Sequence, residues 1–227
     1  MDWPLRLIVF DVDGTLVDSQ ADILAAMAMA FGAEGLPVPD RSNVLSIVGL
    51  SLPVAIARLA PLANGPQQDR LVEGYKAAYV EMRAQTGAAQ SSPLYPGALE
   101  TLEHLYAQPD VVMGVATGKS RRGLDKLVEA HDLERFFVTR QVADFHPSKP
   151  HPSMLLQAMS DAGVAPEATV MVGDTSFDMD MAAAAGARGI GVAWGYHPRH
   201  ALTQASVVVE SFATLPAALS SIWSETV

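Results

Sequence analysis

The sequence predicts an α/β fold in which a parallel sheet is interrupted, after its first strand, by an inserted block of helices. Short apolar runs alternate with longer helical patterns along most of the chain, as in repeated βα units. Most of these runs are apolar on both faces, which is typical of strands that helices cover on each side. Between residues 19 and 90 the alternation stops and only helical patterns remain.

The strands and the inserted helices follow from these patterns. The expected strands are Leu5–Phe10, Val111–Ala116, Phe136–Thr139, Thr169–Val172, Gly189–Ala193 and Val207–Val209. The expected helices of the inserted block are Ala21–Phe31, Asn43–Val48, Leu52–Leu59 and Gln67–Gln85. In the last of these, apolar and aromatic residues recur at helical spacing, among them Leu71, Tyr75 and Tyr79.

Turn signals bound the helical block on both sides. Asp13-Gly14 lies upstream, and the segment 91–97, Ser-Ser-Pro-Leu-Tyr-Pro-Gly, follows it. Helices inserted after the first strand of an α/β core are typical of a cap domain on two hinges. We therefore expect residues 1–17 and 92–227 to form a catalytic core and residues 18–91 to form an all-helical cap.

Composition excludes several classes of protein. The formal charge of −10 argues against a nucleic-acid partner, and the absence of cysteine excludes disulfides, thiolate zinc sites and a cysteine nucleophile. No apolar stretch approaches the roughly 18 residues of a membrane span. The N-terminal apolar run stops at Asp11, unlike a signal peptide. We expect a cytoplasmic protein without a membrane anchor, and the sequence indicates no oligomeric state.

Asp11 and Asp13 directly follow the first apolar run, where a buried strand ends. Two residues apart in an extended chain, their side chains point to the same side. Unpaired carboxylates are costly there, and a hard cation such as Mg²⁺ would remove that cost. An ordinary Asp-Gly turn is the alternative interpretation.

A second acidic strand end is Gly173-Asp174-Thr175-Ser176-Phe177-Asp178, which follows another apolar run. If a helix begins here, Asp174 and Asp178 are four residues apart and share a face. Acidic residues in a first helical turn can also act only as caps or dipole partners. Two acidic strand ends in one chain favour a shared metal.

Two weaker motifs offer groups that bind phosphate. Thr117 and Gly118 end a strand and can present a hydroxyl and free backbone N–H groups, although Thr-Gly is also common in loops. Pro150 and Pro152 keep Lys149 out of a helix, so that its compact positive charge can reach an anion. Most lysines are instead solvated at the surface.

Other residues near these motifs are expected to have structural roles. Lys119, Arg121 and Arg122 should form the solvated start of a surface helix. The loop Trp194–His197 should be packed rather than line an entrance. In the cap, Met27 and Met29 are expected to fill the core. Asp18, Ser19 and the turn Gly49–Leu52 are expected to face the active site.

Together the four motifs resemble the haloacid dehalogenase-like superfamily of hydrolases. The family order is Asp-x-Asp, Thr-Gly, Lys-Pro and Gly-Asp-x-x-x-Asp at strand ends, and here these motifs begin at Asp11, Thr117, Lys149 and Gly173. The helical insertion resembles the C1 cap of subfamily I, in the phosphoglycolate phosphatase-like branch. The resemblance covers essentially the whole chain. It implies a Rossmann-like core whose first strand lies between those of the second and fourth motifs, at a topological switch point.

The resemblance also implies a role for each motif residue. Asp11 would be the nucleophile and a Mg²⁺ ligand, and Asp13 the general acid/base, whose backbone carbonyl also binds the metal. The remaining residues would complete the metal site (Asp174, Asp178) or hold the transferring phosphoryl group (Thr117, Gly118, Lys149). These roles describe a Mg²⁺-dependent phosphatase acting through an aspartyl-phosphate on a small phosphorylated metabolite, with phosphoglycolate the best single guess.

Alternative functions share much of this pattern. A phosphomutase of the β-phosphoglucomutase type and a pyrophosphatase would carry the same core motifs. A 2-haloacid dehalogenase would need no metal, and Asp13 argues against it because such enzymes generally lack this second aspartate. A non-catalytic binding protein on the same fold is disfavoured because all the core catalytic positions are present.

Overall fold

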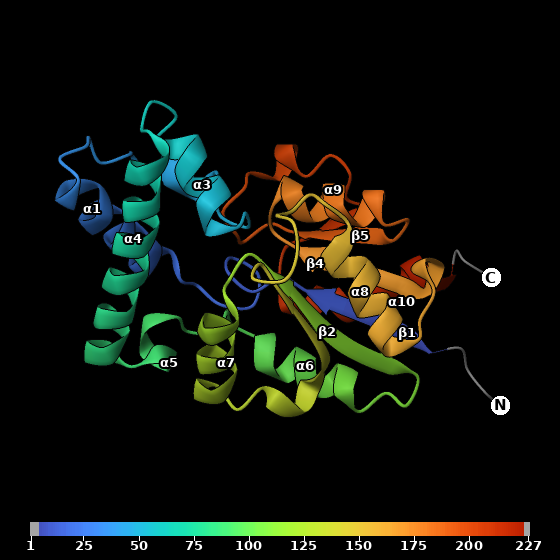
Figure 1. Cartoon of the computed structure of the whole chain (residues 1–227). Helices are drawn as coiled ribbons and strands as arrows, with labels where there is room; N and C mark the ends of the chain where they lie inside the picture. The colour runs from blue at the N-terminus through green and yellow to red at the C-terminus, as the bar shows by residue number, and fades with distance from the viewer. Residues whose placement is uncertain (1–4, 225–227) are drawn as a thin grey trace.

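The computed structural model describes residues 5–224, apart from the side chain of residue 88, and has a parallel sheet at its centre (Figure 1). The strand order is β3-β2-β1-β4-β5-β6, and all neighbouring strands are parallel. The strands are β1 (Arg6–Phe10), β2 (Val111–Thr117), β3 (Phe137–Val142), β4 (Thr169–Gly173), β5 (Arg188–Val192) and β6 (Val207–Val209). The predicted α/β fold with a parallel sheet is confirmed.

Strand β1 occupies the centre of the sheet, where it pairs with β2 on one side and with β4 on the other. The order of strands reverses here, since β2 and β3 lie to one side and β4 to β6 to the other. Open α/β sheets bind ligands at such a point, outside the carboxyl ends of the strands. The position expected for the first strand is therefore confirmed, and it places the residues after β1 at the centre of this edge.

Helices cover both faces of the sheet. Ile8 and Phe10 point into one hydrophobic cluster, which includes residues of α6 (Ala98–Tyr106), α7 (Arg121–Ala130) and α10 (Leu215–Ser224). Leu7 and Val9 point into a second cluster, with residues of α8 (Ser153–Ala162) and α9 (Ser176–Ala184). Side chains alternate between faces along a strand, so a strand covered on both sides must be apolar throughout. This is why β1 continues, after its first residue Arg6, as the unbroken apolar run Leu7–Phe10.

The block between β1 and α6 is helical in the structure and lies to one side of the sheet (Figure 1). Its helices are α1 (Gln20–Ala33), α2 (Arg41–Leu45), α3 (Leu52–Leu59), α4 (Gly65–Thr86) and α5 (Ala88–Ser91). They have a hydrophobic cluster of their own, which contains Met27, Phe31, Ile56 and Leu71. We call residues 18–91 the helical segment.

The chain enters and leaves the helical segment at adjacent points. Val17 forms an antiparallel bridge with Leu94, and the N–H of Asp18 donates to the carbonyl of Pro93 at 2.9 Å. The two connections therefore run side by side. No helix in the part of the chain described by the structure is long and apolar enough to cross a membrane.

Several element boundaries differ from expectation for local reasons. The helix expected over Asn43–Val48 begins earlier, because the Asp40 side chain accepts the N–H of Asn43 at 2.8 Å and caps it. Met27 is buried as expected, whereas the placement of Met29 in the core of the helical segment was wrong, since it is 48% exposed. Two positions along a helix turn a side chain by about 200°, so Met27 and Met29 point in nearly opposite directions.

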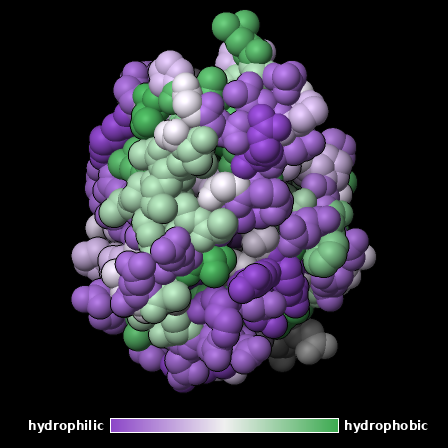
Figure 2. Space-filling view, turned by 60° about the vertical axis from the view of Figure 1, so that its left-hand side comes forward, coloured by the Kyte–Doolittle hydropathy of each residue, from purple (hydrophilic) through white to green (hydrophobic). Residues whose placement is uncertain are grey.

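The face that carries the helical segment shows a weakly hydrophobic band bordered by hydrophilic residues (Figure 2).

Candidate functional site

The carboxyl edge of the sheet brings the motif residues together. Asp11 follows β1, Thr117 ends β2, Asp174 follows β4, and Lys149 comes from the loop after β3. All four side chains are at most 1% exposed. Parallel strands end at the same edge of a sheet, so residues more than a hundred positions apart meet there.

A cluster of three buried carboxylates lies at the end of β1. Oxygens of Asp11, Asp174 and Asp178 lie within 4.8 Å of one another. The Lys149 ammonium is 2.9 Å from Asp11 Oδ1 and 2.6 Å from Asp178 Oδ1. Three carboxylates against one ammonium leave an excess of negative charge that is costly away from water. A divalent cation would balance it.

Asp11 is the carboxylate whose oxygens remain open. Both of its oxygens are buried and receive no hydrogen bond from a neighbouring loop, and Oδ1 is paired with the Lys149 ammonium at 2.9 Å. Buried polar atoms without partners are rare in folded proteins and mark a place for a ligand or ion. Hard carboxylate oxygens suit Mg²⁺, so the residues present fit a magnesium site.

Asp174 is held by the loops after β1 and β5. The Thr15 hydroxyl donates to Asp174 Oδ1 at 3.0 Å, and the N–H of Tyr196 donates to Oδ2 at 2.8 Å. Gly14 lies so close that a Cβ there would come within 2.2 Å of Asp174 Oδ2, and its φ of +84° also favours glycine. Helix α9 begins only at Ser176, so the condition under which Asp174 and Asp178 would share a helical face is not met, although their carboxylates do lie in one cluster.

Asp178 caps a helix and holds Lys149 at the same time. Its Oδ2 accepts the N–H and the hydroxyl of Thr175, at 3.0 and 2.7 Å, and its Oδ1 accepts from Lys149. Thr175 is the N-cap of α9, and the reciprocal bonds form a capping box. Both oxygens of Asp178 are thus engaged by protein donors. Capping, the alternative interpretation of such acids, is therefore one role of Asp178, and holding Lys149 is the other.

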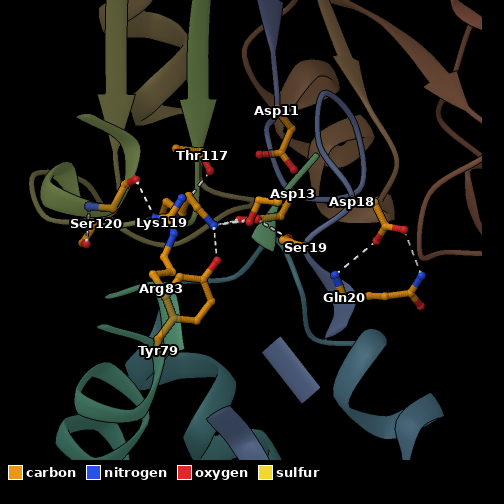
Figure 3. A network of polar contacts seen from close by, with 12 residues as sticks. Asp11, Asp13, Asp18, Ser19, Gln20, Tyr79, Arg83, Thr117, Lys119 and Ser120 are labelled. Atoms are coloured by element: carbon orange, nitrogen blue, oxygen red, sulfur yellow. Dashed lines mark hydrogen bonds and ion pairs between the residues drawn. The ribbon is translucent and has the colours of Figure 1, made fainter. Parts of the chain in front are cut away.

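Asp13 is paired with a cation that the sequence did not assign to the site. Lys119 Nζ donates to both carboxylate oxygens, at 2.6 and 2.8 Å, and the Ser19 hydroxyl donates to Oδ1 (Figure 3). Burial lowers the pKa of Lys119, but the charges of Asp13 and Tyr79 and the hydrogen bond to Asp13 raise it above its ordinary value. The pair is charge-assisted and only 10% exposed on each side.

The expectation that Lys119 is a solvated residue at the start of a surface helix was therefore wrong. Helix α7 begins at Arg121, so Lys119 lies in the turn between β2 and the helix and points back along the sheet edge. Arg121 and Arg122 do lie in that helix, where the Arg121 side chain is 42% exposed and Arg122 is exposed. The sequence did contain one indication that Lys119 belongs to the site: it directly follows the Thr-Gly pair at the end of a strand.

The helical segment contacts the core at the same edge. A Cβ on Gly118 would lie 2.6 Å from the Leu50 carbonyl oxygen, so the backbones of β2's end and the Gly49–Leu52 turn meet there. The N–H of Ser51 donates to the Ser148 hydroxyl at 2.9 Å, next to Lys149. This turn faces the site, as does Ser19.

The loop after β5 is packed, as expected, and also supports the site. Trp194 Nε1 donates to the Thr15 carbonyl at 3.1 Å, and its ring lies against Phe212. The Tyr196 hydroxyl accepts the N–H of Ser19 at 3.0 Å, while its own N–H holds Asp174. No spacing in the sequence pointed to this double role, because the two partners of Tyr196 lie 177 and 22 residues away along the chain.

The electrostatics of the cluster favour neutralisation of its carboxylates. Burial raises the pKa of Asp11 to about 7, with the negative charges of Asp178 and Asp13 adding to the rise and Lys149 opposing it. Burial and the charges of Asp11 and Asp178 raise the pKa of Asp174 well above its ordinary value. Desolvation of carboxylates without enough positive charge has this effect, and a bound cation reverses it.

The site is covered in this structure. A cavity of about 520 Å³ lies between α2 and the loop after β5, but its lining includes none of the clustered carboxylates. Asp11, Asp13, Asp174 and Asp178 are each at most 7% exposed.

Comparisons with known proteins agree with this geometry. A family model of haloacid dehalogenase-like hydrolases matches residues 8–192. The chain is 36% identical over 210 residues to a probable phosphatase, IndB, of Dickeya dadantii, covering 91% of this chain and 90% of that protein. It is 32% identical over 198 residues to a phosphoglycolate phosphatase of Vibrio parahaemolyticus, covering 85% and 86%. The crystal structure of a predicted phosphoglycolate phosphatase from Haemophilus somnus superposes with a TM-score of 0.82 at 25% identity, covering 94% and 97%.

Burial of Asp11 predicts a pH-dependent effect of removing its charge. Its pKa is raised above the unfolded value, so its contribution to stability is complete below about pH 4 and is lost as pH rises through about 7. In EDTA, Asp11→Asn should therefore gain stability over the unmodified protein, by several degrees more at pH 8 than at pH 5.5. Thermal melts of both proteins across this range measure the difference.

Removing the charge of Asp11 also relieves part of the rise in the pKa of Asp174, which changes the difference in the same direction. The two proteins share His146 and His197, whose pKa values burial lowers. Lowered histidine pKa values make stability rise with pH, and this contribution cancels in the difference between the two melts. A difference in melting temperature that stays constant from pH 5.5 to pH 8 would contradict the raised pKa of Asp11.

Proposed function

The chain belongs to the haloacid dehalogenase-like hydrolase family, and we propose that it is a Mg²⁺-dependent phosphatase that uses Asp11 as its nucleophile. The observation that carries this proposal is the carboxylate of Asp11, buried at the topological switch point with both oxygens unpartnered by hydrogen bonds and a lysine 2.9 Å away. A carboxylate needs no base to activate it, and the adjacent ammonium provides for an anionic substrate.

The proposed reaction proceeds in two displacements. An Asp11 oxygen forms a bond to phosphorus as the bond to the ester oxygen breaks, and Asp13, which has to be protonated for this step, gives its proton to that leaving oxygen. Asp13 then takes a proton from water, the water oxygen bonds to phosphorus, and the bond between phosphorus and Asp11 breaks. Inorganic phosphate leaves, and both carboxyl groups return to their starting states. Lys119 and Ser19 hold Asp13 in position for both proton transfers.

The phosphoryl group is held by positive charge and by backbone donors. Lys149 lies between Asp11 and Asp178, where it can bind a phosphoryl oxygen beside the nucleophile. The Thr117 hydroxyl and the backbone N–H groups near Gly118 approach from β2. Stabilising the charge on the equatorial oxygens is most of what phosphoryl transfer requires of a protein.

Asp11 and Asp174, with the backbone carbonyl of Asp13, would hold Mg²⁺, and Asp178 would bind directly or through water. The bound ion supplies positive charge that neutralises the carboxylates and the phosphoryl oxygens. A Mg²⁺ ion held there would balance the excess of negative charge in the cluster. We also propose that residues 18–91 act as a cap, because this segment covers the site and its two connections run side by side.

We propose a small phosphate monoester as the substrate, with phosphoglycolate the best single candidate. A site closed by its helical segment leaves no path for a phosphoprotein or a long polymer unless that segment opens. Relatives named phosphoglycolate phosphatase, 30 to 33% identical, supply the candidate acid. Sugar phosphates and pyrophosphate remain the alternatives against which it is tested.

Asp11→Asn should lower kcat by several orders of magnitude while leaving the fold intact. The amide replaces the nucleophile and one metal ligand at once, and losses of this size follow removal of a covalent nucleophile. Steady-state kinetics with a saturating monoester measure the effect, with circular dichroism as the control for folding. Retention of more than a few per cent of kcat would contradict the aspartyl-phosphate mechanism.

Activity should require Mg²⁺ and be inhibited by Ca²⁺. A sparse carboxylate site that keeps several waters suits the octahedral preference of Mg²⁺, whereas Ca²⁺ takes more ligands and would hold Asp11 in a less reactive arrangement. Assays after exhaustive chelation, with each ion added back, test this. Full activity without any divalent ion would favour the metal-independent dehalogenase chemistry instead.

Phosphoglycolate should give the highest kcat/KM in a panel that includes pyrophosphate, glucose 1-phosphate and a phosphopeptide. The comparison is made at one Mg²⁺ concentration with phosphate release as the readout. If another small ester exceeds phosphoglycolate a hundredfold, the named substrate is wrong but the phosphatase class stands. If the phosphopeptide is best, the argument from a closed cap fails as well.

A further inference from the structure

Arg83 brings a half-buried guanidinium with two unpartnered donor atoms from α4 to the edge of the active site. Its Nη1 donates to the Gly123 carbonyl of α7 at 3.4 Å, so the side chain reaches from the helical segment to the core. Its Nε and Nη2 atoms are buried and have no hydrogen-bond partner. Among the described residues, no carboxylate forms an ion pair with it. Buried donors of a charged group are rarely left without an acceptor.

A second cation lies beside it. The Arg83 guanidinium and the Lys119 ammonium both approach the ring of Tyr79, at 5.4 and 5.3 Å from its centre, and Lys119 Nζ is also 3.4 Å from the Tyr79 hydroxyl. Figure 3 shows Arg83 next to Tyr79 and Lys119, close to Asp13. The aromatic face stabilises cations on a scale that does not replace an ion pair or a hydrogen bond.

The charges at this place do not balance. Asp13 pairs with Lys119, which leaves the charge of Arg83 uncompensated next to another cation. Two positive groups share this corner in a chain whose formal charge is −10. Like charges in a poorly hydrated place repel, so the arrangement is stable only at a cost that an anion would remove.

We propose that Arg83 and Lys119 form a subsite for a carboxylate carried by the substrate, a specificity-determining site that rests on the phosphatase function proposed above. The free edge of Arg83 consists of Nε and Nη2, the two parallel donors that match the two oxygens of a carboxylate. Lys119 is bonded to Asp13, two residues from the nucleophile, so the carboxylate and the phosphoryl group belong to one short molecule.

The subsite exists only when the helical segment is seated on the core. Arg83 comes from α4 and Lys119 from the turn after β2, and they meet across the boundary between the two parts. A phosphorylated carboxylic acid would bridge them, with its carboxylate on the segment side and its phosphoryl group at the strand ends. Its binding would therefore favour the closed arrangement in which Asp13 is positioned by Lys119 and Ser19.

The test compares two esters that differ at the distal end, where one has a carboxylate and the other a neutral hydroxymethyl group. Phosphoglycolate carries the carboxylate, and 2-hydroxyethyl phosphate is its neutral counterpart. Arg83→Met should lower kcat/KM for phosphoglycolate by roughly 10- to 100-fold, the range for a hydrogen-bonded charged pair, and change that for the neutral ester less than about threefold. Arg83→Lys, which keeps the charge but loses the paired donors, should fall between Arg83→Met and the unmodified enzyme.

Arg70→Met is the matched control on the same helix. Arg70 is exposed and pairs with Glu34 at 2.9 Å, so its loss should alter neither ester's kinetics. An equal loss for both esters in Arg83→Met and Arg83→Lys would overturn the proposal and leave Arg83 a structural contact to Gly123. A preference of more than tenfold for an ester with a second phosphate in place of the carboxylate would overturn the assignment to a carboxylate.

A binding measurement separates this inference from the function on which it rests. Isothermal titration with Mg²⁺ compares 3-phosphonopropionate with propylphosphonate, neither of which can be hydrolysed. The unmodified protein should bind the carboxylated analogue at least tenfold more tightly, and Arg83→Met should abolish the difference. If the carboxylated analogue binds more tightly but no ester is hydrolysed, the proposed phosphatase function is wrong and the carboxylate subsite stands. Hydrolysis of esters with equal affinity for both analogues would overturn the subsite but not the phosphatase.

Discussion

Burial of carboxylates around a single ammonium at the end of β1 is the constraint on which the rest of this site depends. Asp11, Asp174 and Asp178 converge because the strands that precede them are parallel and adjacent, and Lys149 reaches in from the loop after β3. Neighbouring loops supply donors to two of the three acids, but not to Asp11. Asp11 is thus the carboxylate whose oxygens are free to react, and the negative charge that Lys149 does not balance favours binding of a divalent cation.

The helical segment completes the site as well as covering it. Ser19 contacts Asp13, the Gly49–Leu52 turn meets Gly118, and α4 brings Tyr79 and Arg83 to the corner occupied by Lys119. The segment has its own hydrophobic cluster, so it can move as a unit without losing its internal packing. The contacts that cross to the core are hydrogen bonds, close backbone approaches and a small hydrophobic cluster in which Ile47 and Leu50 pack with Phe177 of α9. In the proposed movement of the cap, opening would expose this cluster, and closure would restore the contact that positions Asp13.

Two lysines at the same edge have different environments and, in the proposed mechanism, different tasks. Lys149 is fully buried between two members of the carboxylate cluster, where an ammonium serves the transferring phosphoryl group. Lys119 is paired with Asp13 and faces the helical segment, where it positions the acid/base residue and, with Arg83, meets the distal end of the substrate. One end of the ligand is thus recognised by the core, and the other is recognised only when both parts of the chain meet.

The α/β class, the strands and the positions of the acidic strand ends could all be predicted from the order of residues. Strand β1 must be apolar on both faces because helices cover both, and the first polar residues after such a run necessarily lie at the sheet edge. Tertiary structure alone decided which charges pair. Asp13 and Lys119 are 106 residues apart, and Thr15 and Asp174 are 159 apart, so no local pattern encodes their contacts. Arg83 occupies an ordinary helical position in the sequence. Its free donor edge acquires a meaning only because α4 is seated against α7, where burial removes the water that would otherwise solvate it.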